Sequence, residues 1–151
     1  VQTQGFAIGL NYFFGRFFTL KGNYSFNKLV KTNEDDPIIP AFNTPEHKFN
    51  LGLSGRKMTF NIGEWKVKNV GFNIQYKWVD GFRFEGSPQF TGFIPAYDLL
   101  DAQVNYTHDP WNTTFKLGAS NLLNNKHYET YGGPEIGRLA YFSILYSHSF
   151  N

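Results

Sequence analysis

The residues that could carry chemistry in this chain are scattered. The four histidines fall in four separate segments, at His47, His108, His127 and His148. No two of them have the i, i+4 spacing that places two metal ligands on one face of a helix. The chain has no Cys, which excludes thiolate zinc sites, disulfides and Cys nucleophiles. We therefore expect no enzyme activity, no metal site and no cofactor.

The densest polar cluster is the acidic run Glu34, Asp35 and Asp36, which Pro37 follows. Clustered carboxylates offer the hard oxygen ligands that Ca²⁺ prefers. No Gly lies among these residues, and their spacing is not that of a calcium loop. A solvated loop is therefore the preferred interpretation.

Aromatic side chains in two polar connections could contact a ligand. Residues 80–97 and 121–137 together contain Phe82, Phe84, Phe90, Phe93, His127, Tyr128 and Tyr131. Aromatic residues exposed in loops often mark contact surfaces. Three interpretations stay open, namely contact with a ligand, packing of one loop on another, and contact with a partner protein.

The segments that must position these loops have a period of two. Between Phe18 and Phe26 the even positions are apolar, aromatic or Gly, and the odd positions are polar. The same alternation recurs over residues 6–14, 49–53, 70–78, 100–106, 115–119 and 142–150. A strand turns successive side chains to opposite faces. The pattern therefore predicts an all-β chain of seven strands that needs no helix.

The connections between these segments alternate in length. Short or medium ones (15–16, 55–68 and 107–112) alternate with long polar ones (30–46, 80–97 and 121–137). This is typical of an antiparallel barrel in an outer membrane, with short periplasmic turns and long external loops. No apolar run is long enough for a transmembrane helix. The net charge of +2 comes without a long basic block, which disfavours nucleic acid as a partner.

The alternation predicts one apolar face and one polar face for the sheet. In a large membrane barrel the apolar face contacts lipid and the interior is polar. We expect Phe72, Ile74 and Tyr76 to face lipid. The polar residues expected to face the lumen are Lys21, Gln75, Lys77, Asp101, Gln103 and Lys116. Aromatic residues near both short connections, such as Phe14 and Trp111, favour this barrel over the alternative of a soluble β domain.

Several segments resemble TonB-dependent outer-membrane receptors. Residues 116–124 (KLGASNLLN) are similar to the family's penultimate strand and the N-L-x-N motif after it, and residues 133–138 (GPEIGR) to the step into its last strand. Residues Phe142, Ile144, Tyr146 and Phe150 resemble the family's assembly signal, from which His148 and Asn151 depart. Residues 44–50, 78–80 and 94–97 resemble receptors from Bacteroidota.

The resemblance implies a barrel of about 22 strands around an N-terminal plug that the TonB complex moves during nutrient import. Residues 1–151 would then be the last seven strands of this barrel. The partners would be the plug and earlier strands, the TonB complex through the missing N-terminal part, outer-membrane lipids and a surface lipoprotein. Two alternatives stay open. One is a receptor-like barrel that acts as a structural or assembly subunit without transport, and the other is a small stand-alone barrel, which the odd strand number disfavours.

Overall fold

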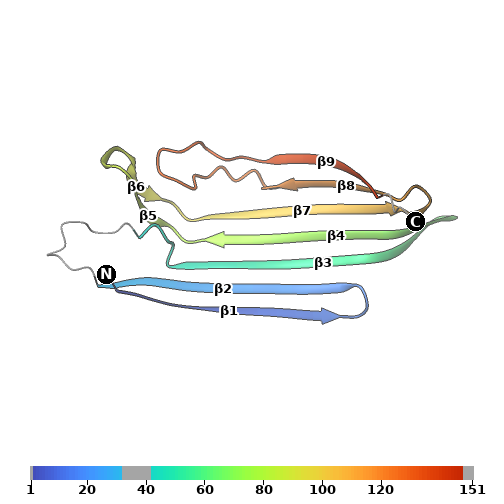
Figure 1. Cartoon of the computed structure of the whole chain (residues 1–151), viewed down its shortest axis with the longest axis horizontal. Helices are drawn as coiled ribbons and strands as arrows, with labels where there is room; N and C mark the ends of the chain where they lie inside the picture. Colours follow the sequence, from blue (N-terminus) through green and yellow to red (C-terminus); the bar gives the residue numbers. More distant parts are fainter. Residues whose placement is uncertain (1, 32–41, 148–151) are drawn as a thin grey trace.

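A computed structural model describes residues 2–31 and 42–147 of the chain. They form one layer of long antiparallel strands (Figure 1). The seven-stranded sheet has the order β1-β2-β3-β4-β7-β8-β9. Its strands are β1 (Gln2–Phe14), β2 (Phe18–Lys31), β3 (His47–Ile62), β4 (Trp65–Val79), β7 (Tyr97–His108), β8 (Thr113–Ser120) and β9 (Leu139–Tyr146). The prediction of seven strands is confirmed. The sheet is open, with β1 and β9 at its edges.

The structure corrects the extent of one predicted connection. Residues 55–68 are not a medium loop, because β3 and β4 continue through most of this segment to a tight turn at Gly63, whose φ is 61°. The register shifts between Gly55 and Met58, and again between Met58 and Phe60. Such bulges insert unpaired residues, so the apolar positions lose their strict period of two. The alternation therefore stops in the sequence before the strands end.

A second correction concerns residues 80–97. This segment contains a small two-stranded sheet of β5 (Phe82–Glu85) and β6 (Thr91–Ile94), joined through the 3₁₀ turn η1 (Pro88–Phe90). A second 3₁₀ turn, η2 (Asp109–Trp111), joins β7 to β8. Four-residue strands are too short to show a clear alternation, which is why the sequence does not reveal them. No helix in the described part of the chain is long and apolar enough to cross a membrane.

The register places residues of one kind side by side across the sheet. One row reads Tyr12, Leu20, Leu53, Ile74, Ala102 and Ala119, and the next reads Lys21, Gly52, Gln75 and Asp101. Because neighbouring rows point to opposite sides, the sheet has an apolar face, which contains the first row, and a polar face, which contains the second.

In the part of the chain that the structure describes, no second layer covers the apolar face. Among the described residues the buried hydrophobic side chains are Met58, Val79 and Ile94. Ile8, Leu117 and Ile144 of the apolar face are each about 60% exposed. A soluble sheet must bury one face in a core, and exposed apolar surface of this extent marks an interaction surface. The soluble alternative does not fit this structure.

The two ends of the sheet differ in their connections. The tight turns of β1–β2, β3–β4 and β7–β8 lie together at one end, here called the turn end, and the long connections lie at the other, the loop end (Figure 1). Aromatic pairs occur near both ends. The rings of Phe14 and Phe18 stack at 5.3 Å at the turn end, and those of Phe49 and Trp78 stack at 5.6 Å toward the loop end. Membrane barrels carry such aromatic girdles at both interfaces.

Candidate functional site

The β5–β6 hairpin and the connection after β8 pack against each other at the loop end. Gly92 of β6 lies under the ring of Tyr131, so closely that a Cβ at this glycine would collide with the ring. Gly132, whose φ is +77°, lies against the ring of Phe90 in the same way. Each segment therefore packs an aromatic ring on a glycine of the other, and we call the two segments, residues 81–96 and 121–138, the loop unit.

The loop unit encloses a hollow of about 430 Å³. Its lining residues are Phe93, Ile94, Pro95, Tyr128, Tyr131 and Gly132. Phe93 is 64% exposed, and the two tyrosines are each a little over 40% exposed. A mostly apolar hollow with two phenol groups can stack on a ring or an apolar part of a ligand and offer hydrogen bonds at its edge.

The hollow brings together three of the seven candidate ligand residues, namely Phe93, Tyr128 and Tyr131. The other four have different surroundings. Phe82 pairs with Ile94 in the small sheet, Phe84 lies beside Gly86, and Phe90 packs on Gly132. His127 is 5% exposed, and its ring stacks on Tyr97 at 4.4 Å. These four side chains support the loop unit and do not line the hollow.

Two asparagines anchor the connection after β8 to the barrel wall. The backbone N–H of Asn121 donates to Oδ1 of Asp101 at 2.8 Å. The Asn121 side chain donates to the carbonyl of Asn125 at 2.8 Å and accepts from the N–H of Asn125 at 2.9 Å. Asn125 in turn donates to the carbonyl of Asp98 at 3.1 Å. Asn121, the first residue of the N-L-x-N segment, and Asn125, the residue after that segment, therefore form a latch at the start of the connection that leads to Tyr128 and Tyr131. Sequence reasoning missed this role.

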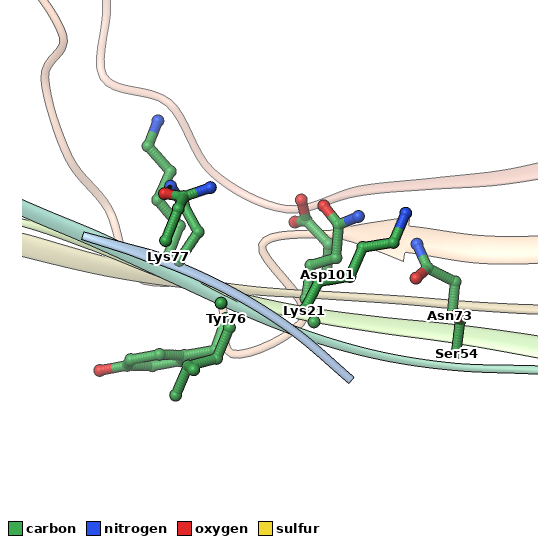
Figure 2. Close-up of a pocket in the computed structure, with 12 residues that line it drawn as sticks. Lys21, Ser54, Asn73, Tyr76, Lys77 and Asp101 are labelled. Carbon is green, nitrogen blue, oxygen red and sulfur yellow. Dashed lines mark hydrogen bonds between the residues drawn. The ribbon is translucent and has the colours of Figure 1, made fainter. Parts of the chain in front are cut away.

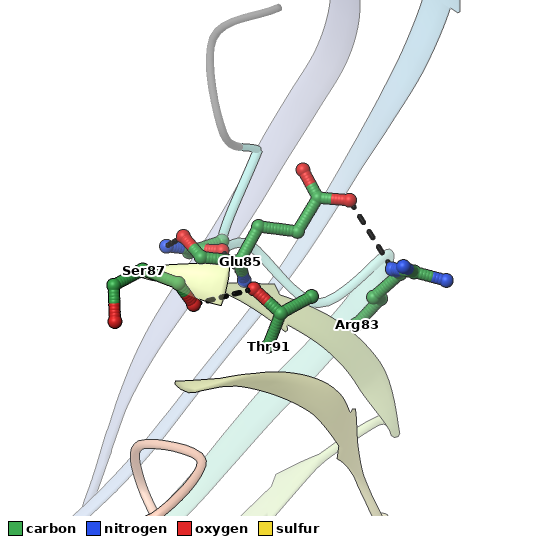
Figure 3. Close-up of polar contacts among 5 residues, drawn as sticks. Arg83, Glu85, Ser87 and Thr91 are labelled. Atoms are coloured by element: carbon green, nitrogen blue, oxygen red, sulfur yellow. Dashed lines mark hydrogen bonds and ion pairs between the residues drawn. The ribbon is translucent and has the colours of Figure 1, made fainter. Parts of the chain in front are cut away.

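A third connection joins this arrangement through Asn43. Its Oδ1 accepts from the N–H of Glu85 at 2.7 Å, and its Nδ2 donates to the carbonyl of Glu85 at 3.0 Å. The side-chain amide thus pairs with the backbone of β5 as a neighbouring strand would. Thr91 Oγ1 donates to the carbonyl of Ser87 at 3.1 Å, and an exposed ion pair links Arg83 to Glu85 at 3.2 Å (Figure 3). The alternation of residue types in the sequence does not reveal the contact between Asn43 and Glu85, because a single side chain makes it.

The polar face contains the residues that the sequence assigns to the lumen. Figure 2 shows Lys21, Asn73, Lys77 and Asp101 on one side of the sheet and Tyr76 on the other. A shallow hollow of about 280 Å³ follows this face. Gln103 accepts a hydrogen bond from Tyr141 Oη at 2.9 Å. Lys116 pairs in register with Asn105 and Ser143.

The remaining candidates lie in β9 or outside the described residues. Phe142 pairs with Leu117 and Ile144 with Phe115, so both belong to the apolar face, and Tyr146 pairs with Thr113. Phe150, His148 and Asn151 lie outside the described residues, as does the acidic run at 34–36. Within residues 2–31 and 42–147, no group of three His, Cys, Asp or Glu could hold a metal ion.

Comparison with known families decides what kind of barrel this is. The model of the TonB dependent receptor-like, beta-barrel family matches residues 1–122, from β1 to just past the end of β8. The chain belongs to this family. The resemblance to TonB-dependent receptors is thereby confirmed. Barrels of this family lie in the outer membrane. A search of curated proteins and of solved structures found no match.

The family match covers part of the chain and says what class of protein the family is. It ends at residue 122, so the resemblance of residues 133–138 and of β9 lies beyond it. The family is a class of receptors and transporters, not a class of enzymes. TonB-dependent receptors in general contain a plug domain and interact with TonB.

Proposed function

We propose that this TonB-dependent receptor barrel imports a nutrient ligand into the periplasm, and that the hollow of the loop unit binds the ligand first. The observation that carries the proposal is the hollow itself, because three long connections are fixed to one another around exposed aromatic side chains. Pre-formed hollows lined by aromatics with a few polar groups are the usual form of a ligand site.

The two faces of the sheet have different roles in this proposal. The apolar face contacts lipid, as in other outer-membrane barrels. Lys21, Gln75, Lys77, Asp101, Gln103 and Lys116 face the lumen, where they hydrogen-bond the plug and water. Amide and ammonium groups spread over a polar wall suit repeated weak contacts with a moving plug.

The open edges of the sheet support further strands beside it. An edge strand in hydrocarbon leaves N–H and C=O groups unsatisfied, at several kcal/mol for each group. We therefore propose that β1 and β9 pair with other strands of a larger barrel that surrounds a plug. The alternate apolar residues Phe142 and Ile144 of β9, with Tyr146 and with Phe150 outside the described residues, would serve as the assembly signal.

The test measures uptake by cells that produce the full receptor. Labelled ferric siderophores, cobalamin, oligosaccharides and peptides are supplied, with and without a protonophore. We expect one class to enter only while the proton gradient is intact. Tyr131→Ala should then weaken its binding about 10- to 30-fold, which corresponds to about 1.4–2 kcal/mol for an aromatic contact residue.

The matched control is Tyr12→Ala, since Tyr12 is an exposed tyrosine of the apolar face and should leave binding unchanged. Uptake that is equally fast with and without the protonophore would refute energy-coupled import. If no class is taken up and deletion of the barrel disrupts an outer-membrane complex, the structural alternative is correct. If ligand binding is unchanged in Tyr131→Ala, the ligand binds somewhere other than the loop unit.

A further inference from the structure

The β3–β4 hairpin extends beyond its neighbours at the turn end. The ladder between β2 and β3 ends at the pair Phe18–Gly55, and the ladder between β4 and β7 ends at Val70–Tyr106. Just beyond these pairs, the Arg56 N–H donates to the Phe17 carbonyl at 2.9 Å and Asn69 Nδ2 donates to Asp109 Oδ2 at 2.6 Å. Farther out, within the described residues, β3 and β4 pair with each other as far as Ile62–Trp65. We call residues 56–69 the projecting hairpin. Its tip is the part of the sheet that reaches farthest at this end (Figure 1).

The length of this projection can be estimated from strand geometry. β3 continues seven residues past Gly55, whereas β4 reaches about three residues farther than the end of β7. At ~3.3 Å per residue and a strand tilt of ~40°, the tip lies between ~8 and ~17 Å deeper than the adjacent strand ends. The polar layer on each side of the hydrocarbon is only ~5–7 Å thick. The hairpin therefore crosses the headgroup layer on the periplasmic side, where short turns lie.

The projecting hairpin concentrates positive charge. It contains Arg56, Lys57, Lys66 and Lys68 against the single acid Glu64. Its net charge of +3 exceeds the +2 of the whole chain, so all other residues together are slightly negative. The four basic residues are exposed. In the described parts of the chain, the ion pairs occur elsewhere, at Arg83–Glu85 and Lys126–Glu135.

The apolar face continues onto this hairpin. Along the β3–β4 ladder, the pair Gly55–Phe72 is followed by the apolar pairs Met58–Val70 and Phe60–Val67. Phe60 is 46% exposed. Lys66 and Lys68 lie on either side of Val67, the residue that pairs with Phe60. An aromatic residue at the end of an apolar band with basic residues beside it is the arrangement by which membrane proteins meet the interface. Lysine and arginine stems can cover apolar surface there while their charged groups reach the headgroups.

We propose that the projecting hairpin binds anionic phospholipid headgroups of the periplasmic leaflet. Phe60 and Val67 contact the acyl chains near the interface, and Met58 is buried beneath them. The basic residues at headgroup depth attract lipid phosphates that carry a net negative charge. This inference depends on the outer-membrane barrel and its orientation, and not on import or on the loop unit.

The experiment uses the full receptor in nanodiscs made of equal parts phosphatidylcholine and phosphatidylglycerol. Lipids retained after mild detergent extraction are counted by native mass spectrometry. We expect retention of phosphatidylglycerol over phosphatidylcholine, and a loss of this preference at high salt. The double variant Lys66→Gln/Lys68→Gln should lower the apparent affinity for phosphatidylglycerol about fivefold for each lysine, since one basic residue near an anionic surface contributes ~1 kcal/mol.

Two matched variants separate this effect from a general loss of charge. Lys28→Gln/Lys126→Gln removes two lysines from the loop end and should leave retention unchanged. Lys66→Arg/Lys68→Arg should keep the preference, and heat-modified migration on gels checks that each variant folds. Equal retention of phosphatidylglycerol in the Gln double variant would overturn the proposal. It would also be overturned if the wild type showed no lipid preference but bound polyglutamate through Lys66 and Lys68, because the hairpin would then dock an acidic protein.

Discussion

The wall strand β4 and the loop unit both expose aromatic side chains, but different forces position them. In β4, Phe72, Tyr76 and Trp78 lie on one face because the backbone ladder turns every second residue to that side. In the loop unit, the ring of Tyr131 packs on Gly92, and the segment that contains Tyr128 and Tyr131 follows the hydrogen bonds between Asn121 and Asn125. The wall therefore withstands changes in single side chains that keep its polarity. The loop unit depends on a few individual contacts.

The sharpest test of this contrast places one charge on either face of β4. Ile74→Arg puts a guanidinium on the apolar face near mid-strand and should cost about 2–4 kcal/mol, whereas Gln75→Arg on the polar face should be nearly neutral. Folding titrations of the full receptor into lipid vesicles measure both. If Gln75→Arg were the more costly change, the two faces would be assigned the wrong way round.

A smaller effect is expected from the latch of the loop unit. The Asn121 side chain is 3% exposed, exchanges two hydrogen bonds with Asn125, and has a φ of 51°. Asn121→Ala should cost about 1–3 kcal/mol of local stability, because buried backbone groups lose their partners and Ala disfavours the left-handed region. Hydrogen exchange at the Asn125 amide should accelerate while the wall strands keep their protection.

Asn121→Asp is the graded control for this change. It keeps the acceptor for the Asn125 N–H and tolerates the same φ, but it removes the donor to the Asn125 carbonyl. We expect a loss between those of the wild type and Asn121→Ala. Equal exchange in all three proteins would mean that the latch does not hold the loop.

The smallest effect is expected at Asn43. Its amide pairs with the backbone of Glu85, but the site is exposed and water can replace either bond. Asn43→Ala should therefore cost only about 0.5–1 kcal/mol, seen as faster exchange of the Glu85 amide alone. A global fall in the melting temperature after this change would show that the first long connection is part of the wall's stability.

The alternation of residue types predicts the wall because strand geometry repeats. Positions such as Leu20, Ile74 and Leu117 reveal their face from sequence alone. The prediction fails at Lys57 and Asn69, whose positive φ values mark irregular backbone within the β3–β4 hairpin. Of the candidate site, the sequence identifies the two segments that pack on each other in the structure, but not which of their rings meet. The Asn43 side chain pairs with the backbone of Glu85, and the Asn121 side chain pairs with the backbone of Asn125. Contacts made by individual side chains produce no repeating pattern in the sequence.

The single-layer sheet has a consequence for how this chain can vary over generations. Side chains in a packed core have fixed neighbours, so a change of volume is penalised. In the orientation that we propose, residues such as Ile8, Leu117 and Ile144 contact fluid acyl chains instead, and these adapt to any apolar shape. Homologues are therefore free to exchange Leu, Ile, Val and Phe there. Gly118 cannot be exchanged in this way, because the ring of Tyr141 crosses its backbone and would collide with a Cβ. Among homologues, we therefore expect the glycines and asparagines of this barrel to be conserved more strongly than most of its apolar residues.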